Sequence, residues 1–220
     1  MTIERAAALG IAVVSGLLVA RLGPGAIRSW MIYSGTGKRR QMDASGQAPA
    51  APPGVRDRMA LLVESGYRHI GETRVDLPVG PRFAWIMAAA NGDSYAIVAG
   101  GTGRVALTGL YSAWPDGMWL GTIHPMGNPT ERAGLQVRVV TRTLDDAVET
   151  HRAGLERLRS VHGDPRAVRS MPDMLALDAD YRERFGGSRL RPAAIRIAIP
   201  AVLAGCALAL SLVLLAVSFR

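Results

Sequence analysis

Residues 82–124, RFAWIMAAANGDSYAIVAGGTGRVALTGLYSAWPDGMWLGTIH, decide the fold of this chain. Three turn signals divide the stretch into short apolar runs: Asn91-Gly92, Gly100–Gly103 and Pro115-Asp116-Gly117. Asn-Gly and Pro-Asp-Gly connections are typical of tight turns between neighbouring strands. With its flanks, the stretch predicts an antiparallel β-meander of about six strands, at Tyr67–Leu77, Arg82–Ala90, Ser94–Ala99, Arg104–Ser112, Met118–His124 and Leu135–Thr141.

Helical periodicity replaces the strand pattern on both sides of the meander. Val55–Ser65 has apolar residues at helical spacing and is followed by Gly66, a typical helix C-cap. Asp145–Val161 also has helical spacing, with acidic residues near its start and Arg157 and Arg159 near its end. Asp173–Phe185 forms a third amphipathic segment. The fold class that follows is α+β, with helices that flank one sheet.

Both ends of the chain are strongly apolar. Ile197–Phe219 contains no charged residue and is long enough, as a helix, to cross a hydrocarbon core of roughly 30 Å. Ala6–Ala20 is a shorter apolar run, for which a cleaved signal peptide is the alternative to a signal anchor. Only Arg5 stands before it, beside Glu4, and no clear cleavage site follows. The sequence therefore predicts one transmembrane helix at each end.

The net charge of +8 is concentrated beside these two apolar ends. The positive-inside rule then places the central domain in the cytoplasm, and the protein in the plasma membrane of a bacterial-type cell as a multi-pass protein. A basic surface for nucleic acid is not expected, because residues 56–191 are almost charge-balanced. The flanking basic residues are Arg21, Arg28, Lys38, Arg39, Arg40, Arg189, Arg191 and Arg196.

Composition divides the chain into five expected segments. Residues 24–54 are rich in Gly, Pro, Ser and Ala and have few bulky apolar groups, which is typical of a flexible linker. The expected order is transmembrane helix 1 in residues 1–23, a basic linker in 24–54, a cytoplasmic α+β domain in 55–163, an amphipathic helical connector in 164–191 and transmembrane helix 2 in 192–220.

Small residues recur every four positions in the first apolar segment and form a ridge along one helical face. Such ridges let helices approach closely, so a packing face for a helix of the same chain or of a partner is expected. The alternative is that Ala and Gly are simply frequent here. The candidate packing residues are Ala8, Ala12, Gly16, Ala20, Ala201 and Gly205.

Residues of reactive type are present but not in a recognisable catalytic pattern. Ser112, Asp116 and His124 are the one nearby trio with nucleophile, acid and base types. Turn capping by Ser112 and Asp116, with His124 exposed at a strand end, is the favoured interpretation of these residues. Gly100–Arg104 resembles a phosphate loop but leads into a strand, where a phosphate loop needs a helix N-terminus.

Metal, redox and ligand chemistry receive little support from the remaining residues. His151 and His162 would lie about 16 Å apart along one helix, too far to share an ion. The single cysteine, Cys206, lies in the second apolar segment. No catalytic residue, cofactor or metal is therefore expected. The aromatic residues of the strands suit a sheet core or, alternatively, an apolar ligand pocket: Trp85, Trp114, Trp119, Tyr95 and Tyr111.

These observations favour a non-catalytic accessory or assembly subunit of a membrane protein complex. Its expected partners are the lipid bilayer and a membrane protein or a second copy, bound through the transmembrane helices. A membrane-tethered domain that binds a lipid or small ligand is the alternative. A membrane-bound hydrolase is the third possibility, and it depends on Ser112, Asp116 and His124 alone.

Overall fold

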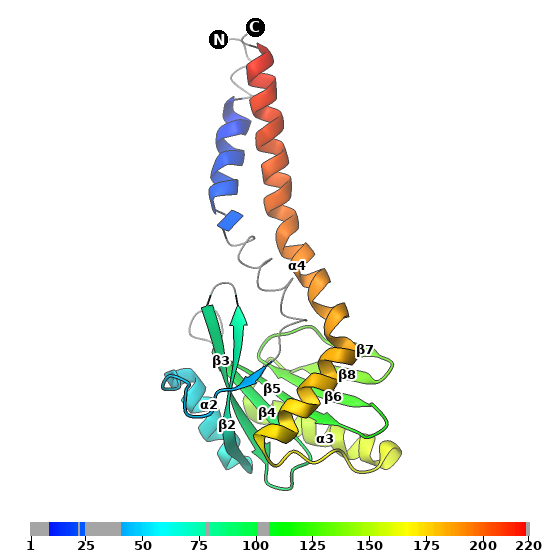
Figure 1. The fold of residues 1–220 in the computed structure, drawn as a ribbon. Coiled ribbons are helices and arrows are strands. Elements are labelled where there is room, and N and C mark those ends of the chain that lie inside the picture. The colour runs from blue at the N-terminus through cyan, green and yellow to red at the C-terminus, as the bar shows by residue number, and fades with distance from the viewer. Residues whose placement is uncertain (1–8, 22, 25–40, 78–79, 101–105, 219–220) are drawn as a thin grey trace. The chain divides into compact units, whose positions relative to one another are not determined.

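The chain folds into two units, seen in a computed structural model that describes residues 9–21, 23–24, 41–77, 80–100 and 106–218. One, here called the α+β unit, comprises Arg40–Val75 and Pro81–Asp180. The other, here called the helical unit, comprises Met1–Arg39, Asp76–Gly80 and Tyr181–Arg220. Figure 1 shows the elements of both. The expected division into five segments stays a prediction.

An eight-stranded sheet dominates the α+β unit. Strands β3, β4, β5 and β6 pair antiparallel in sequence order, as the meander predicts. The order across the sheet is β1-β2-β3-β4-β5-β6-β8-β7. The strands are β1 (Met42–Asp43), β2 (Tyr67–Leu77), β3 (Gly80–Ala89), β4 (Tyr95–Gly100), β5 (Ala106–Ala113), β6 (Trp119–His124), β7 (Thr130–Arg132) and β8 (Leu135–Val139).

The prediction of a purely antiparallel six-stranded meander is wrong at the far edge of the sheet. β8 pairs parallel to β6, with Trp119 opposite Leu135. The short strand β7 pairs antiparallel with β8 on its other side. The connection through β7 brings the chain back to the end of the sheet where β6 began, so β8 runs in the direction of β6. The sheet is therefore mixed.

Two of the three predicted turns form as expected, and the third, Gly100–Gly103, lies outside the described residues after Gly100. At Asn91-Gly92, the Gly92 N–H donates to the Ala89 carbonyl at 2.9 Å, and Gly92 has a φ of 82° that favours glycine. At Pro115-Asp116-Gly117, the Met118 N–H donates to Asp116 Oδ1 at 3.1 Å. Local turn chemistry thus determines where the central strands end.

Two helices pack beside each other against the sheet, α2 (Pro53–Glu64) and α3 (Leu144–His162). α3 begins at a capping box, in which the Thr143 side chain and the Asp146 side chain each accept a backbone N–H of the other residue. Gly154 lets α3 approach β6 closely, because a Cβ at this position would lie 3.1 Å from Leu120 Cδ2. The apolar core of the unit includes two clusters, one around Val55, Leu62 and Leu144 and another around Trp114, Leu120 and Leu155.

The opposite face of the sheet is covered as well. Successive β3 residues Ile86, Met87 and Ala88 are all fully buried, although neighbouring residues of a strand point to opposite faces. Within the α+β unit, the first turns of α4 (Met171–Ser218) bury Met171 and Met174. Both faces therefore contribute to the core.

The helical unit contains a helix at residues 9–21 and the C-terminal part of α4, which lie side by side in Figure 1. The prediction of two membrane spans is wrong. In the described part of the chain, no helix is both sufficiently long and sufficiently apolar to cross a membrane. Residues 9–21 rise only about 20 Å, against a hydrocarbon core of roughly 30 Å. The C-terminal apolar run is part of a helix that already begins at Met171.

Two other predictions depended on those spans. The membrane component of the predicted fold class is wrong, and so is the multi-pass plasma-membrane localisation with a cytoplasmic central domain, because each required helices that cross the bilayer. The α+β component of the fold class is present in the eight-stranded sheet and its flanking helices.

Candidate functional site

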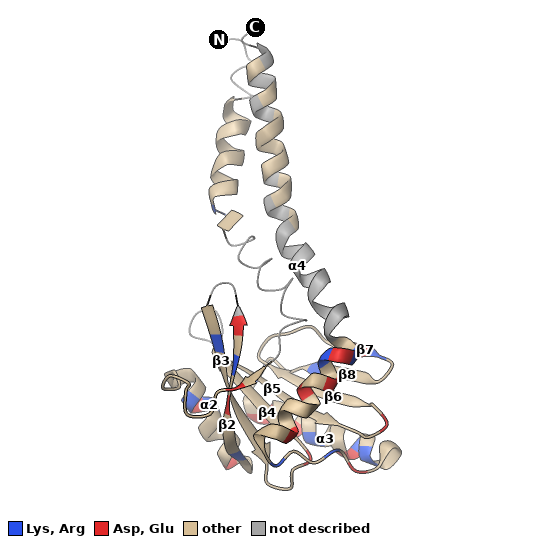
Figure 2. Ribbon diagram, viewed as in Figure 1, with Lys and Arg blue, Asp and Glu red and all other residues tan. Residues whose placement is uncertain are grey.

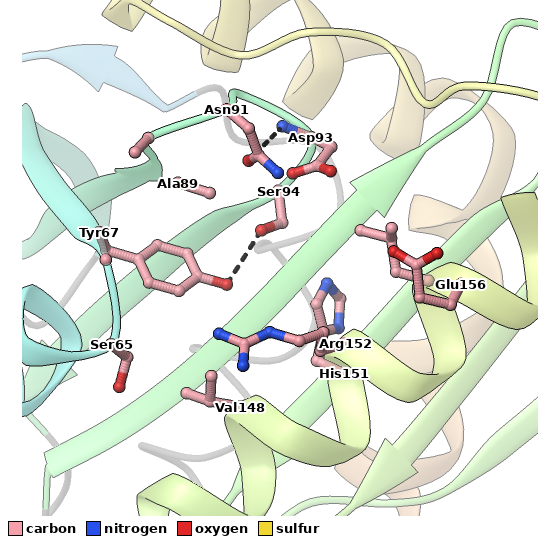
Figure 3. Close-up of a pocket in the computed structure, with 13 residues that line it drawn as sticks. Ser65, Tyr67, Ala89, Asn91, Asp93, Ser94, Val148, His151, Arg152 and Glu156 are labelled. Carbon is pink, nitrogen blue, oxygen red and sulfur yellow. Dashed lines mark hydrogen bonds between the residues drawn. The ribbon is translucent and has the colours of Figure 1, made fainter.

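A pocket of about 310 Å³ opens in the α+β unit between the β3–β4 turn, the start of β2 and one face of α3. Figure 3 shows its side chains, with Tyr67 and Ser94 on one side and the α3 residues opposite. The lining residues are Ser65, Gly66, Tyr67, Ala89, Ala90, Asn91, Asp93, Ser94, Val148, His151, Arg152, Leu155 and Glu156.

A buried histidine at the pocket wall forms a fully bonded polar network. His151 Nε2 lies 3.1 Å from Ser112 Oγ, and His151 Nδ1 lies 3.1 Å from Thr122 Oγ1. Ser112 donates its single hydroxyl hydrogen to the Asp93 carbonyl at 2.8 Å. Ser112 must therefore accept from Nε2–H, and Thr122 donates to Nδ1. Each polar atom in the network is satisfied.

This tautomer makes His151 a structural group and not a base for Ser112. The nitrogen that faces Ser112 carries a hydrogen, and the lone pair of the other nitrogen accepts from Thr122. Burial lowers the pKa of His151 to about 3, so the ring is neutral at physiological pH. The network joins α3 to β5 and β6, and through Ser112 it also holds the β3–β4 turn.

The structure separates the three residues of the predicted trio and gives each a different partner. Ser112 contacts His151. Asp116 accepts from His162 at 2.6 Å, and this hydrogen bond holds the pKa of Asp116 below its ordinary value. His124 donates from Nδ1 to the Val140 carbonyl at 2.9 Å. These contacts are those of a sheet and its turns, and they do not form a Ser-His-Asp relay.

Charge is unevenly distributed around the pocket. Arg159 contacts Asp93 at 2.5 Å, Glu156 at 2.7 Å and Asp164 at 3.2 Å, so one guanidinium faces three carboxylates. Arg152, one turn before Glu156 on α3, has neither a hydrogen-bond nor an ion-pair partner among the described residues. The pocket lining therefore contains an unpaired arginine as well as the carboxylates of Asp93 and Glu156.

The aromatic residues of the strands belong mainly to the core. Trp85, Trp114 and Trp119 are buried, and Trp114 Nε1 donates to the Gly163 carbonyl at 2.8 Å, where α3 ends. Tyr95 and Tyr111 pack together with ring centroids 5.5 Å apart. The interpretation of these residues as sheet core agrees with their burial.

The predicted packing residues of the helical unit are described in part. Ala12 is buried, and a Cβ at Gly16 would lie 3.9 Å from Leu208 Cδ1 of α4. Ala20 is exposed, and a Cβ at Gly205 would have no neighbour within 4 Å. Ala8 lies outside the described residues, as does the side chain of Ala201. The proposed packing face stays a prediction.

The basic flank is also untested. Arg21 is exposed at the end of the first helix. Arg28, Lys38, Arg39 and Arg40 lie outside the described residues. The side chains of Arg189, Arg191 and Arg196 also lie outside the described part of the structure.

Sequence reasoning missed the His151 network, although one signal was available. His151 falls on the apolar face of α3, three residues after Val148 and four before Leu155, so its burial follows from the helical period. Its partners Ser112 and Thr122 are 39 and 29 residues away in sequence, and no local pattern connects them. No family model matches this chain, and no significantly similar curated protein or solved structure was found.

Proposed function

We propose that this protein is a non-catalytic assembly subunit that binds an apolar helix of a partner polypeptide through its helical unit. The observation that supports this proposal is the exposure of large apolar side chains on both helices of that unit, 43–66% for each residue. Contiguous apolar surface of this kind marks interaction sites. The residues are Leu9, Ile11, Val13, Val14, Leu17, Leu18, Ile199, Val202, Leu203, Leu210 and Val213.

The spacing of these residues indicates a helical partner. On α4, the exposed residues Ile199, Leu203, Cys206, Leu210 and Val213 are spaced by alternating intervals of four and three positions, and Val202, Ala209 and Ala216 are exposed as well. This is the a/d pattern by which a helix inserts its side chains between those of another helix. A seam of this type needs a second apolar helix to cover it.

The first helix has a similar exposed stripe. Ile11, Val14 and Leu18 are three and four positions apart. Ala12 and Gly16 lie between them, and Gly16 faces Leu208 of α4. The small residues thus serve the contact inside the unit, while the larger ones remain available outside it. In Figure 2 this part of the helix carries no charged residue.

The experiment is native mass spectrometry of the full chain purified from its own cells, compared with two variants. Leu203→Glu combined with Leu210→Glu places charge in the exposed seam of α4. Val161→Glu is the matched control, because Val161 is 74% exposed on α3 and lies outside the helical unit.

We expect the wild type and Val161→Glu to form the same complex of defined stoichiometry, and the double variant to be a lone chain. Circular dichroism should show the same helix content in all three proteins, because every substituted side chain is exposed. A lone chain in the wild type, or an intact complex in the double variant, would contradict the proposal.

A further inference from the structure

The Tyr67 side of the pocket offers hydrogen-bond donors that the protein does not use. Tyr67 Oη and Ser94 Oγ share one hydrogen bond of 2.9 Å, and both residues are buried. Two hydroxyls supply two hydrogens, so one remains free to donate into the pocket. Burial raises the pKa of Tyr67, which keeps the phenol protonated as a donor. Arg152 adds a guanidinium without a partner among the described residues.

The carboxylates of the pocket offer acceptors in excess. Arg159 bonds Asp93 through Oδ2 and Glu156 through Oε1, which leaves the second oxygen of each carboxylate available. Three carboxylates around one guanidinium leave this cluster with a negative charge. A cationic group is the ligand that such a cluster attracts.

The β3–β4 turn holds Asp93 in place before any ligand arrives. Ser112 donates to the Asp93 carbonyl at 2.8 Å, and the Asp93 N–H donates to Asn91 Oδ1 at 3.4 Å. Ser112 is itself bound by buried His151. Donors and acceptors fixed in this way lose little freedom on binding.

We propose that this pocket binds a small zwitterion of the amino-acid class. Its carboxylate accepts hydrogen bonds from Arg152 and from the Tyr67–Ser94 hydroxyl pair, and its ammonium group lies against Asp93 and Glu156. Ala89, Val148 and Leu155 provide an apolar wall for a side chain. A volume of about 310 Å³ is at the small end of ligand pockets.

A zwitterion fits this arrangement better than a simple anion does. A phosphate dianion bound to Arg152 would also lie near the negative charges of Asp93 and Glu156, which line the same pocket. A molecule with both charges meets an opposite charge at each end. In Figure 3 the Arg152 and Tyr67 side chains lie apart from the carboxylates of Asp93 and Glu156.

The test is isothermal titration of the full chain with each of the common L-amino acids, and with acetate and methylammonium as probes that have one charge each. We expect at least one amino acid to bind, and to bind about tenfold or more tightly than either single-charge probe. The absence of binding by every amino acid at about 10 mM, which corresponds to a binding free energy of only about 3 kcal/mol, would overturn the proposal. Equally tight binding of acetate would also overturn it.

Two variants locate the site. Arg152→Gln should weaken amino-acid binding about tenfold or more, because a charge-assisted hydrogen bond to the carboxylate is lost. Arg157→Gln is the matched control, since Arg157 is an exposed arginine of the same helix that bonds Gln136 outside the pocket. Equal affinity of the two variants would overturn the assignment, and matching thermal unfolding of both proteins would show that the fold is intact.

Discussion

Lowering the pH from 7 to 5 should destabilise the α+β unit by about 2 kcal/mol through His151 alone. In the folded chain the pKa of His151 is about 3, because the ring is fully buried. In the unfolded chain it returns to about 6.5. Below pH 6.5 the unfolded chain therefore takes up a proton that the folded chain does not. Stability from this residue is complete above about pH 6.5 and is lost progressively as the pH falls toward 3.

The magnitude follows from the distance between pH 5 and the unfolded pKa. That distance is about 1.5 units, and each unit corresponds to about 1.4 kcal/mol. Burial also lowers the pKa of His124, so stability from that residue is lost as the pH falls through the same range. The lowered pKa values of Asp43, Asp116 and Asp173 add to the loss only below about pH 5. A single pH series on the wild type would mix these contributions with that of His151.

Comparison with His151→Gln separates them. Glutamine keeps a polar side chain at this position but does not titrate. Urea unfolding at pH 7 and at pH 5, followed by the fluorescence of buried Trp114 and Trp119, reports on the α+β unit. Between pH 7 and pH 5, we expect the free energy of unfolding to fall by about 2 kcal/mol more in the wild type than in the variant. An equal loss in both proteins would refute the conclusion that His151 is held neutral by burial.

Two further substitutions test the packing and the start of α3 by thermal unfolding. Gly154→Val should lower the free energy of unfolding by about 1–3 kcal/mol, because the new Cβ would lie 3.1 Å from Leu120 Cδ2. The control is Ala153→Val at the exposed neighbouring position, which should lower it by less than about 1 kcal/mol. Thr143→Ala should lower the free energy of unfolding by about 1 kcal/mol, because the capping box is lost. Thr141→Ala is the control and should leave stability nearly unchanged. Similar losses for both variants would mean that the cap does not stabilise the protein.

Local sequence chemistry was a good guide wherever an element depends on its own residues and immediate neighbours. The predicted strand Ser94–Ala99 differs from β4 by one residue at each end, and the predicted helix Asp145–Val161 differs from α3 in the same way. Turn residues and helical periodicity act over a few positions, so their effect can be seen in a single sequence.

Apolarity alone was a poor guide to the two ends of the chain. Both apolar runs do form helices in the described residues, yet none of the helices there meets the length and apolarity that a membrane span requires. The exposed positions instead follow helical spacing on each helix. Which face a helix leaves exposed depends on what packs against its other side, and composition does not contain that information.

The sequence by itself determined the central antiparallel strands, their two tight turns and the helices that flank them, because these features depend on interactions over a few residues. The tertiary structure decided the parallel pairing of β6 with β8, the contacts of His151 with Ser112 and Thr122, and the placing of Arg152 and Asp93 in one pocket. Each of these joins groups that are distant along the chain. Their contact depends on the path of the whole backbone, which no local pattern specifies.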